Sequence, residues 1–279
     1  MDFAALLHTL KAEARGQAPA AAPSAPSAPP LPTSSPPSRQ PSTASSSQAP
    51  APPPEDCLSL PAQLSSCCVS PASLPQCLYM PSVIPAEQEA RLLASIYHSS
   101  HSALWVELRA RRLQLWAAPL PPFLSQLCAS LVQAGLFSAE QPPNHVLINA
   151  YERAEGIAPH SDGPSYLPTV ATLSLGSSCP MRYSVLYGRE GPGEAGGQLL
   201  GELLLRPCSL VVTRGLLYTQ YAHCIPEAAE SSLAQGALLW NAEAAQAEPG
   251  SLAVREATRV SITLRHKLPE ERAEEQQQS

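Results

Sequence analysis

Short runs rich in apolar residues follow one another through the second half of the chain, and in some of them, such as 259–265, polar and apolar residues alternate as in half-buried strands. Glycine and proline separate these runs at Gly156, Gly176, Pro207 and Gly215. The predicted strands are residues 145–151, 169–175, 181–186, 198–205, 209–213, 218–224 and 259–266. Short strands at this spacing favour a sandwich or jelly roll over a parallel sheet.

The first half of the folded region has a different pattern. Apolar residues at helical spacing predict helices over residues 85–98, after Pro85, and over 122–134, before Gly135. Between them, alternation over residues 104–116 predicts a strand. The expected fold class is therefore mainly β with flanking helices.

Composition divides the chain into four segments. Residues 1–15 predict a short amphipathic helix, which either frays or docks on a protein partner. Residues 16–77, rich in Pro, Ala and Ser at least to position 56, predict a disordered linker, because such a segment buries too little apolar surface to offset its conformational entropy. The folded domain is expected over 78–268, followed by a polar tail at 269–279.

Charge and cysteine content narrow the classes of protein. The net charge of -6 excludes a broadly basic surface but permits a local arginine patch. The eight cysteines form no CxxC pair, which favours free thiols in a reducing compartment. Without a basic signal segment or an apolar run of about 18 residues, we expect an intracellular monomer in the cytoplasm, the nucleus or both, with no membrane association.

Three polar side chains form a candidate metal site. His160 and Asp162 stand two apart, so in an extended chain both project to one face. His223 can supply a second imidazole from another predicted strand. Two histidines and one carboxylate leave coordination positions for a co-substrate and dioxygen, which suits Fe(II). The alternative is that all three are solvated polar residues.

The last predicted strand has two unlike faces. Arg259, Ser261, Thr263 and Arg265 alternate with apolar residues along it. A buried guanidinium needs a paired anion, and no acidic residue lies within the strand. A dicarboxylate co-substrate would supply two such charges, and arginine binds carboxylates in bidentate geometry. The alternative is an exposed sheet face.

The order of these motifs resembles that of a known family. NxY at Asn149 and Tyr151, HxD, a distal histidine and RxSxTxR look like the AlkB family of Fe(II)/2-oxoglutarate dioxygenases, over about residues 78–268. NHVLINAYERAEGIAPHSDGPSYLPTVATLSLGS at 144–177 is the most specific part.

The resemblance implies a double-stranded β-helix and a set of functional residues. His160, Asp162 and His223 would bind Fe(2+). The residues expected to hold 2-oxoglutarate are Asn149, Tyr151, Arg259, Ser261, Thr263 and Arg265. With O2, the enzyme would demethylate or hydroxylate a nucleic acid, or a protein, and release succinate and CO2.

The same resemblance suggests substrate contacts in Arg112, Gln114, Trp116 and Tyr166. Arginine would contact phosphate and an aromatic ring would stack on a base. The alternative is that Trp116 is an ordinary core residue and that the arginines lie on a solvated face.

Ser261 departs from the family pattern because an Asn is common there. Residues 163–165 also lack the acidic residues of the alkylated-base repair members. Segments 187–197 and 226–257 are expected to be surface loops.

Two other functions compete with the demethylase. A protein hydroxylase of the same fold usually anchors 2-oxoglutarate with one basic residue soon after the distal histidine. Residues 224–254 contain no Lys or Arg, which favours the AlkB arrangement. A binding module on the same fold, with little or no turnover, is the second alternative.

Overall fold

The computed structural model describes residues 58–74, 76–185 and 197–269. The predicted helix at 1–15, the linker up to residue 57, most of the glycine-rich segment at 187–197 and the tail from 270 lie outside these residues. Within the described ranges, no helix is long and apolar enough to cross a membrane.

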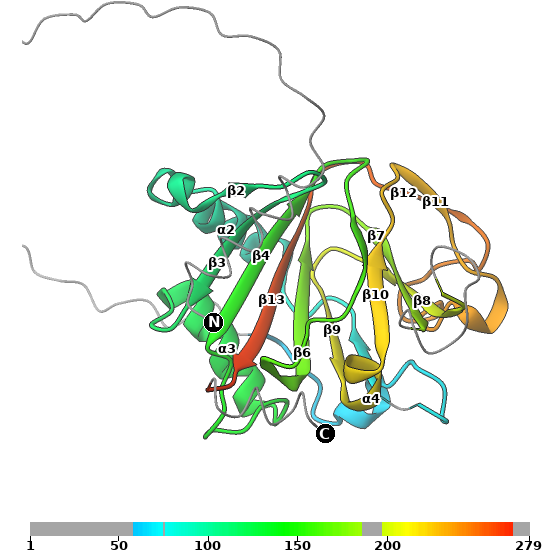
Figure 1. The fold of residues 1–279 in the computed structure, drawn as a ribbon, viewed down its shortest axis with the longest axis horizontal. Coiled ribbons are helices and arrows are strands. Elements are labelled where there is room, and N and C mark those ends of the chain that lie inside the picture. The colour runs from blue at the N-terminus through cyan, green and yellow to red at the C-terminus, as the bar shows by residue number, and fades with distance from the viewer. Residues whose placement is uncertain (1–57, 75, 186–196, 270–279) are drawn as a thin grey trace, which may run out of the picture. The chain divides into compact units, whose positions relative to one another are not determined.

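Two antiparallel sheets form the core of the protein (Figure 1). The larger sheet contains, in spatial order, β1 (Cys77–Met80), β9 (Ser209–Arg214), β6 (Tyr166–Leu175), β13 (Arg259–Lys267), β4 (His145–Tyr151), β3 (Arg112–Ala117) and β2 (Val106–Glu107). The smaller sheet contains β5 (Ile157–His160), β10 (Tyr221–Ile225), β7 (Cys179–Val185) and β8 (Leu199–Leu205). Tyr79 and Val211 of the larger sheet share one buried cluster with Tyr183 and Leu203 of the smaller, so the two sheets pack face to face. This is the predicted jelly roll.

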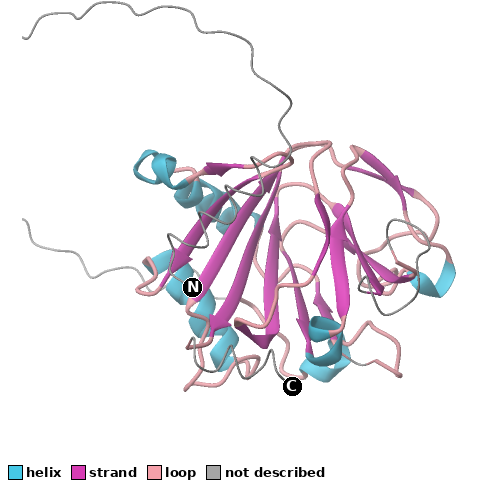
Figure 2. Ribbon diagram, viewed as in Figure 1, coloured by secondary structure: helices cyan, strands magenta, loops and turns pink. Residues whose placement is uncertain are grey.

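Helices cover the outer face of the larger sheet (Figure 2). They are α2 (Ala86–Ile96) and α3 (Pro122–Gln133), both close to their predicted bounds. Leu92 of α2 and Leu127 of α3 belong to one buried cluster with Ile148 and Ile262 of the sheet. The loss of this apolar surface from water is the main stabilising contribution here.

The central strand β13 has the two faces that its sequence predicts. Val260, Ile262 and Leu264 point into the cluster under the helices. The alternate residues Arg259 and Arg265 are also buried and therefore lie on the inner face, toward the smaller sheet. Neighbouring strands continue this inner row in register, because β4 pairs with one edge of β13 and β6 with the other.

The folded unit begins before Leu78, contrary to the expectation of a linker through residue 77. Leu58 is buried in the cluster under the helices, and Leu60 and Leu64 pack against it. Leu64–Cys67 forms a short 3-10 helix, η1, and Cys68 makes a bridge to Leu78. The apolar residues of this segment have no regular period, which is why the sequence pattern does not reveal their packing.

Residues 226–257 were expected to be a surface loop, and this expectation is wrong. They contain β11 (Glu230–Ser232), η3 (Gly236–Leu238) and β12 (Leu252–Val254), with β11 paired to β12. Trp240 stacks on Tyr183, with the ring centroids 5.3 Å apart. Gly201 permits this contact, because a Cβ at that position would overlap the indole. The insertion is therefore part of the core beside the smaller sheet.

Two predicted strands are shorter than expected. The segment 104–116 is divided into η2 (Ser99–Leu104), β2 and β3, with a hairpin tip at residues 108–111. Tyr218 lies in the short helix α4 (Gly215–Thr219) rather than in a strand, and β10 starts only at Tyr221. Positive φ at Gly215 allows the chain to leave β9 and turn into α4.

Candidate metal and co-substrate site

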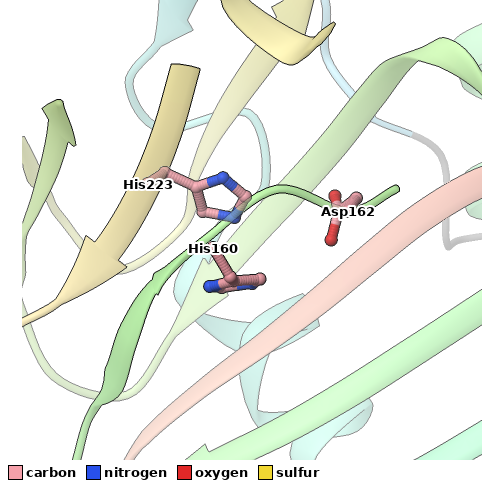
Figure 3. A group of neighbouring side chains, drawn as sticks. All are labelled: His160, Asp162 and His223. Carbon is pink, nitrogen blue, oxygen red and sulfur yellow. The ribbon is translucent and has the colours of Figure 1, made fainter. Parts of the chain in front are cut away.

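Three side chains from two segments gather on the inner side of the smaller sheet (Figure 3). His160 ends β5, Asp162 follows two residues later, and His223 lies on β10. His160 and His223 are register partners across the antiparallel pair, so their side chains project to the same face. Their ring centroids are 4.4 Å apart, and one ligand atom from each of the three residues lies within 4.8 Å of the others.

The charges around this group favour binding of a cation. Burial alone would raise the pKa of Asp162, but Arg265 and then the two histidines outweigh it and lower this pKa, so the carboxylate is ionised. Burial, followed by the neighbouring His160, lowers the pKa of His223 to about 4. A neutral imidazole and a carboxylate are the forms that bind a metal.

Arg265 supplies the counter-ion of Asp162. Its Nη1 donates to Asp162 Oδ1 at 3.0 Å, and both side chains are at most a tenth exposed. The guanidinium also lies over the ring of Tyr166, 4.1 Å from its centroid. The strand holds no acidic residue, but Asp162 reaches Arg265 from a segment distant in sequence.

Arg259, at the other end of β13, has no such partner. It is 2% exposed, its Nη2 donates to Ser174 Oγ at 3.1 Å, and it lies over the ring of Tyr151. Among the described residues no carboxylate forms a salt bridge with it, and its Nε has no acceptor. An unpaired buried charge is costly. This end of the strand is therefore suited to an anion from outside the chain.

Hydroxyl and amide groups line the strand between the two arginines. Ser261 is buried and lies opposite Asn149 on one neighbouring strand and Ser174 on the other. Thr263 accepts a hydrogen bond of 3.4 Å from Thr172. The structure thus places the whole predicted co-substrate set, Asn149, Tyr151, Arg259, Ser261, Thr263 and Arg265, on one inner face.

Three of the four predicted substrate residues lie elsewhere. Arg112, Gln114 and Trp116 pair in register with Ala150, Ile148 and Val146, whose side chains pack under the helices. Their side chains therefore point to the outer face, away from the metal group. The buried Gln114 donates to Ile96 O and accepts from Trp116. Substrate contact by these three residues stays a prediction.

The fourth predicted substrate residue, Tyr166, lies on the inner side. Its ring packs against Arg265, and its hydroxyl is 3.1 Å from His145 Nδ1. Burial, followed by Arg265 and Lys267, lowers the pKa of His145 to about 4. Tyr166 thus borders the Asp162 end of the site.

Three residues outside the predicted site set make contacts in this region. Arg111 Nε donates to Asn149 Oδ1 at 3.1 Å. Arg111 lies at the hairpin tip before β3, so strand alternation does not predict this contact. Tyr218 donates to Gly163 O, and the buried Arg255 donates to the carbonyls of Glu152, Glu155 and Pro226. No pattern in the sequence marks these two.

The fold and the site together define an oxygenase. The sequence profile of the 2OG-Fe(II) oxygenase superfamily matches residues 77–265, and the chain belongs to this family. It is an Fe(II)/2-oxoglutarate-dependent dioxygenase of the AlkB type, as its motifs predict. The family's cofactor, Fe(2+), and its co-substrates, 2-oxoglutarate and O2, agree with the donor set of two imidazoles and a carboxylate.

One curated relative matches most of the chain. It is the probable RNA/DNA demethylase ALKBH6 of Danio rerio, 32% identical over 201 residues, which are 67% of this chain and 84% of the relative. This similarity agrees with the AlkB family that the motifs predict. The RNA demethylase ALKBH9B of Arabidopsis thaliana is 26% identical over 108 residues, 39% of this chain and 21% of the relative.

Solved structures are similar at lower identity. OsALKBH1 is 12% identical, with a TM-score of 0.42 over 68% of this chain and 98% of that chain. A prolyl-4-hydroxylase from Pseudomonas putida is also 12% identical, with a TM-score of 0.42 over 69% and 93%. The fold assignment here rests on the strand order and register rather than on these alignments.

Proposed function

We propose that this chain is an oxidative demethylase of nucleic acid that uses Fe(2+), 2-oxoglutarate and O2. His160, Asp162 and His223 would bind the iron, which supplies oxygen activation when bound. The observation that supports this most directly is the meeting of their ligand atoms within 4.8 Å, although Asp162 and His223 are 61 positions apart in the sequence.

The larger sheet would hold 2-oxoglutarate by one of its carboxylates. Arg259 is the natural anchor, since its buried guanidinium lacks a carboxylate partner among the described residues, and Tyr151 lies against it. Asn149, Ser261 and Thr263 offer hydrogen bonds along the same face. Arg265 would act mainly by holding the Asp162 carboxylate in place.

Nucleic acid is the substrate class that the relatives support. ALKBH6 of Danio rerio is named a probable RNA/DNA demethylase and ALKBH9B an RNA demethylase. The reaction would remove an N-methyl group and release succinate and CO2. Tyr166, which packs against Arg265, would contact the base.

The test compares turnover in the wild type and in a His160→Ala/Asp162→Ala variant. Purified protein is incubated with iron, ascorbate, labelled 2-oxoglutarate and methylated RNA and DNA oligonucleotides, and succinate and modified nucleosides are measured by mass spectrometry. We expect succinate and loss of a methylated nucleoside with the wild type only. Equal succinate from both proteins would contradict the proposal.

The same experiment separates the alternatives. A hydroxylated peptide formed in place of a demethylated nucleoside would identify a protein hydroxylase. Nucleic acid binding that survives the double substitution, with no succinate from the wild type, would identify a binding module. Intracellular residence and docking through residues 1–15 stay predictions, which fluorescent tagging and pull-down with a 1–15 deletion would test.

A further inference from the structure

The segment that carries Asp162 is fastened to its surroundings at three points. Arg265 binds the Asp162 carboxylate, Tyr218 donates to Gly163 O at 2.9 Å, and Leu268 N donates to Ser165 O at 2.9 Å. All three contacts are made by the protein itself. The first and third come from β13 and the residue after it, whereas the second comes from α4.

The helix α4 lies between the strand β9 and the strand that carries His223. Gln76 fixes it, because Gln76 Oε1 accepts from Leu217 N at 2.7 Å and Gln76 O accepts from Arg214 N at 3.0 Å. Tyr218 is therefore presented from a supported turn. It also lies only five positions before His223. Its hydrogen bond to Gly163 therefore connects the segment that leads to His223 with the segment that carries Asp162.

The Tyr218 side chain is built into the site rather than lying on the surface. It is 6% exposed and packs in a small buried cluster with Tyr166 and Val170. Burial raises its pKa, so the phenol is protonated and its hydroxyl is a hydrogen-bond donor. The acceptor, Gly163, has φ of +79°, a left-handed turn that directs its carbonyl toward α4 directly after Asp162.

We propose that Tyr218 is a positioning residue for Asp162. By holding the Gly163 carbonyl, it fixes the backbone on the C-terminal side of Asp162, while Arg265 fixes the carboxylate. Two independent restraints then set the position and direction of the ligand atom before a metal arrives. This inference rests on the proposed metal site, and it assigns to that site a residue outside the ligand set and outside the co-substrate set.

Tyr218→Phe isolates the hydroxyl. The ring remains to pack against Tyr166 and Val170, and only the bond to Gly163 O is lost. The matched control is Tyr79→Phe, since Tyr79 is also buried and its hydroxyl accepts a hydrogen bond from the backbone of Arg206, outside the segment that carries Asp162. Thermal melting of both variants reports the general cost of losing a buried tyrosine hydroxyl.

The measurements are Mn(II) affinity by calorimetry and the visible absorption of bound Co(II), which reports ligand geometry. Outer residues that orient metal ligands typically contribute 10–100-fold to affinity. We expect Mn(II) binding about tenfold weaker and an altered Co(II) spectrum in Tyr218→Phe, with both readouts unchanged in Tyr79→Phe. Gly163→Ala, which disfavours the left-handed turn without a steric clash, should weaken Mn(II) binding as well.

The possible failures are distinguishable. Wild-type Mn(II) affinity and Co(II) spectrum in a folded Tyr218→Phe protein would overturn the positioning role and leave the metal site intact. If Tyr218→Phe does not fold, wild-type Mn(II) affinity in Gly163→Ala would overturn it. A wild-type protein that binds neither ion, or binds them equally after His160→Ala/Asp162→Ala, would overturn the metal site itself, and the inference with it.

Discussion

The two ends of β13 present the same side chain to different electrostatic surroundings. Arg265 is paired with Asp162 at 3.0 Å and stacks on Tyr166. Arg259 is also buried, but it donates to a serine hydroxyl and lies over the ring of Tyr151, and no carboxylate among the described residues forms a salt bridge with it. The two arginines lie six residues apart on one face of one strand, so the strand itself does not cause the difference. The difference comes from the residues that face each arginine.

The two arginines of the RxSxTxR motif therefore have different roles. At the Arg265 end, the protein supplies its own anion, and that anion is a predicted metal ligand. At the Arg259 end, we propose that the anion comes from a ligand, because leaving a guanidinium buried and unpaired costs free energy. In this proposal the first end binds a metal and the second binds a carboxylate of the co-substrate. Substitutions should affect the two ends in different ways.

The largest effect on stability is expected at the Arg265 end. Arg265→Met leaves the Asp162 carboxylate buried without its cation, and breaking a buried pair in this way costs about 3–5 kcal/mol. Urea denaturation of the metal-free protein would measure this loss. Added Mn(II) should restore part of it, because the ion replaces the missing positive charge. A variant as stable as the wild type without metal would contradict the importance of the pair.

Arg259→Met should change binding rather than stability. The substitution removes an unpaired buried charge, so the metal-free protein should unfold at the same urea concentration or higher. The affinity for 2-oxoglutarate should fall by about 2–5 kcal/mol, the usual cost of truncating one partner of a buried charge pair. Calorimetry on the Mn(II)-loaded protein measures it, with Arg214→Met, on an exposed strand end, as the control. Unchanged affinity would contradict the assignment of Arg259.

The pH dependence of the free energy of unfolding tests the electrostatics at the Arg265 end, where His145 lies near Arg265. The pKa of His145 is lowered to about 4 in the folded protein from an ordinary value of 6.5, so the unfolded chain binds this proton more readily. The contribution of neutral His145 to the free energy of unfolding is therefore complete above pH 6.5. It is lost as the pH falls from 6.5 to 4, by up to about 3 kcal/mol.

His145→Gln tests this dependence. The wild type also has His223, whose pKa is likewise lowered to about 4, so the variant should lose about half of the pH dependence in this window. Urea denaturation at several pH values between 4 and 7 measures both proteins. Parallel curves for wild type and variant would show that His145 does not titrate as described.

The smallest effect is expected on the outer face of the larger sheet. Arg112 lies over the rings of Tyr97 and Trp105 at 5.4 and 4.8 Å. Such contacts at partly exposed positions contribute about 0.5–1 kcal/mol. Arg112→Ala should lower stability by that amount and leave the affinity for 2-oxoglutarate unchanged. A large loss of co-substrate affinity would contradict the placement of Arg112 away from the co-substrate site.

Local sequence patterns predict the strands and which residues share a face, because alternation is a property of the backbone. They place Arg259, Ser261, Thr263 and Arg265 on one side of β13 and His160 and Asp162 near each other. The same rule groups Arg112, Gln114 and Trp116. Alternation does not determine whether a shared face is turned toward the smaller sheet or toward the helices. Arg112, Gln114 and Trp116 are turned toward the helices.

Contacts between distant segments are what the patterns miss. The pair between Arg265 and Asp162 joins residues 103 positions apart, and the stack of Trp240 on Tyr183 depends on the absence of a side chain at Gly201. Packing of the apolar side chains between residues 58 and 68 under the helices has no periodic signal. These features follow from the closure of two sheets around one space, which is a property of the whole fold.

A crystal structure of the protein with Mn(II) and 2-oxoglutarate tests the central claim most directly, because anomalous scattering locates the ion independently of the protein atoms. We predict one Mn(II) peak bound by His160, Asp162 and His223, and a carboxylate of 2-oxoglutarate paired with Arg259. A metal peak away from these three side chains, or an Arg259 that remains without an anion, would contradict the account.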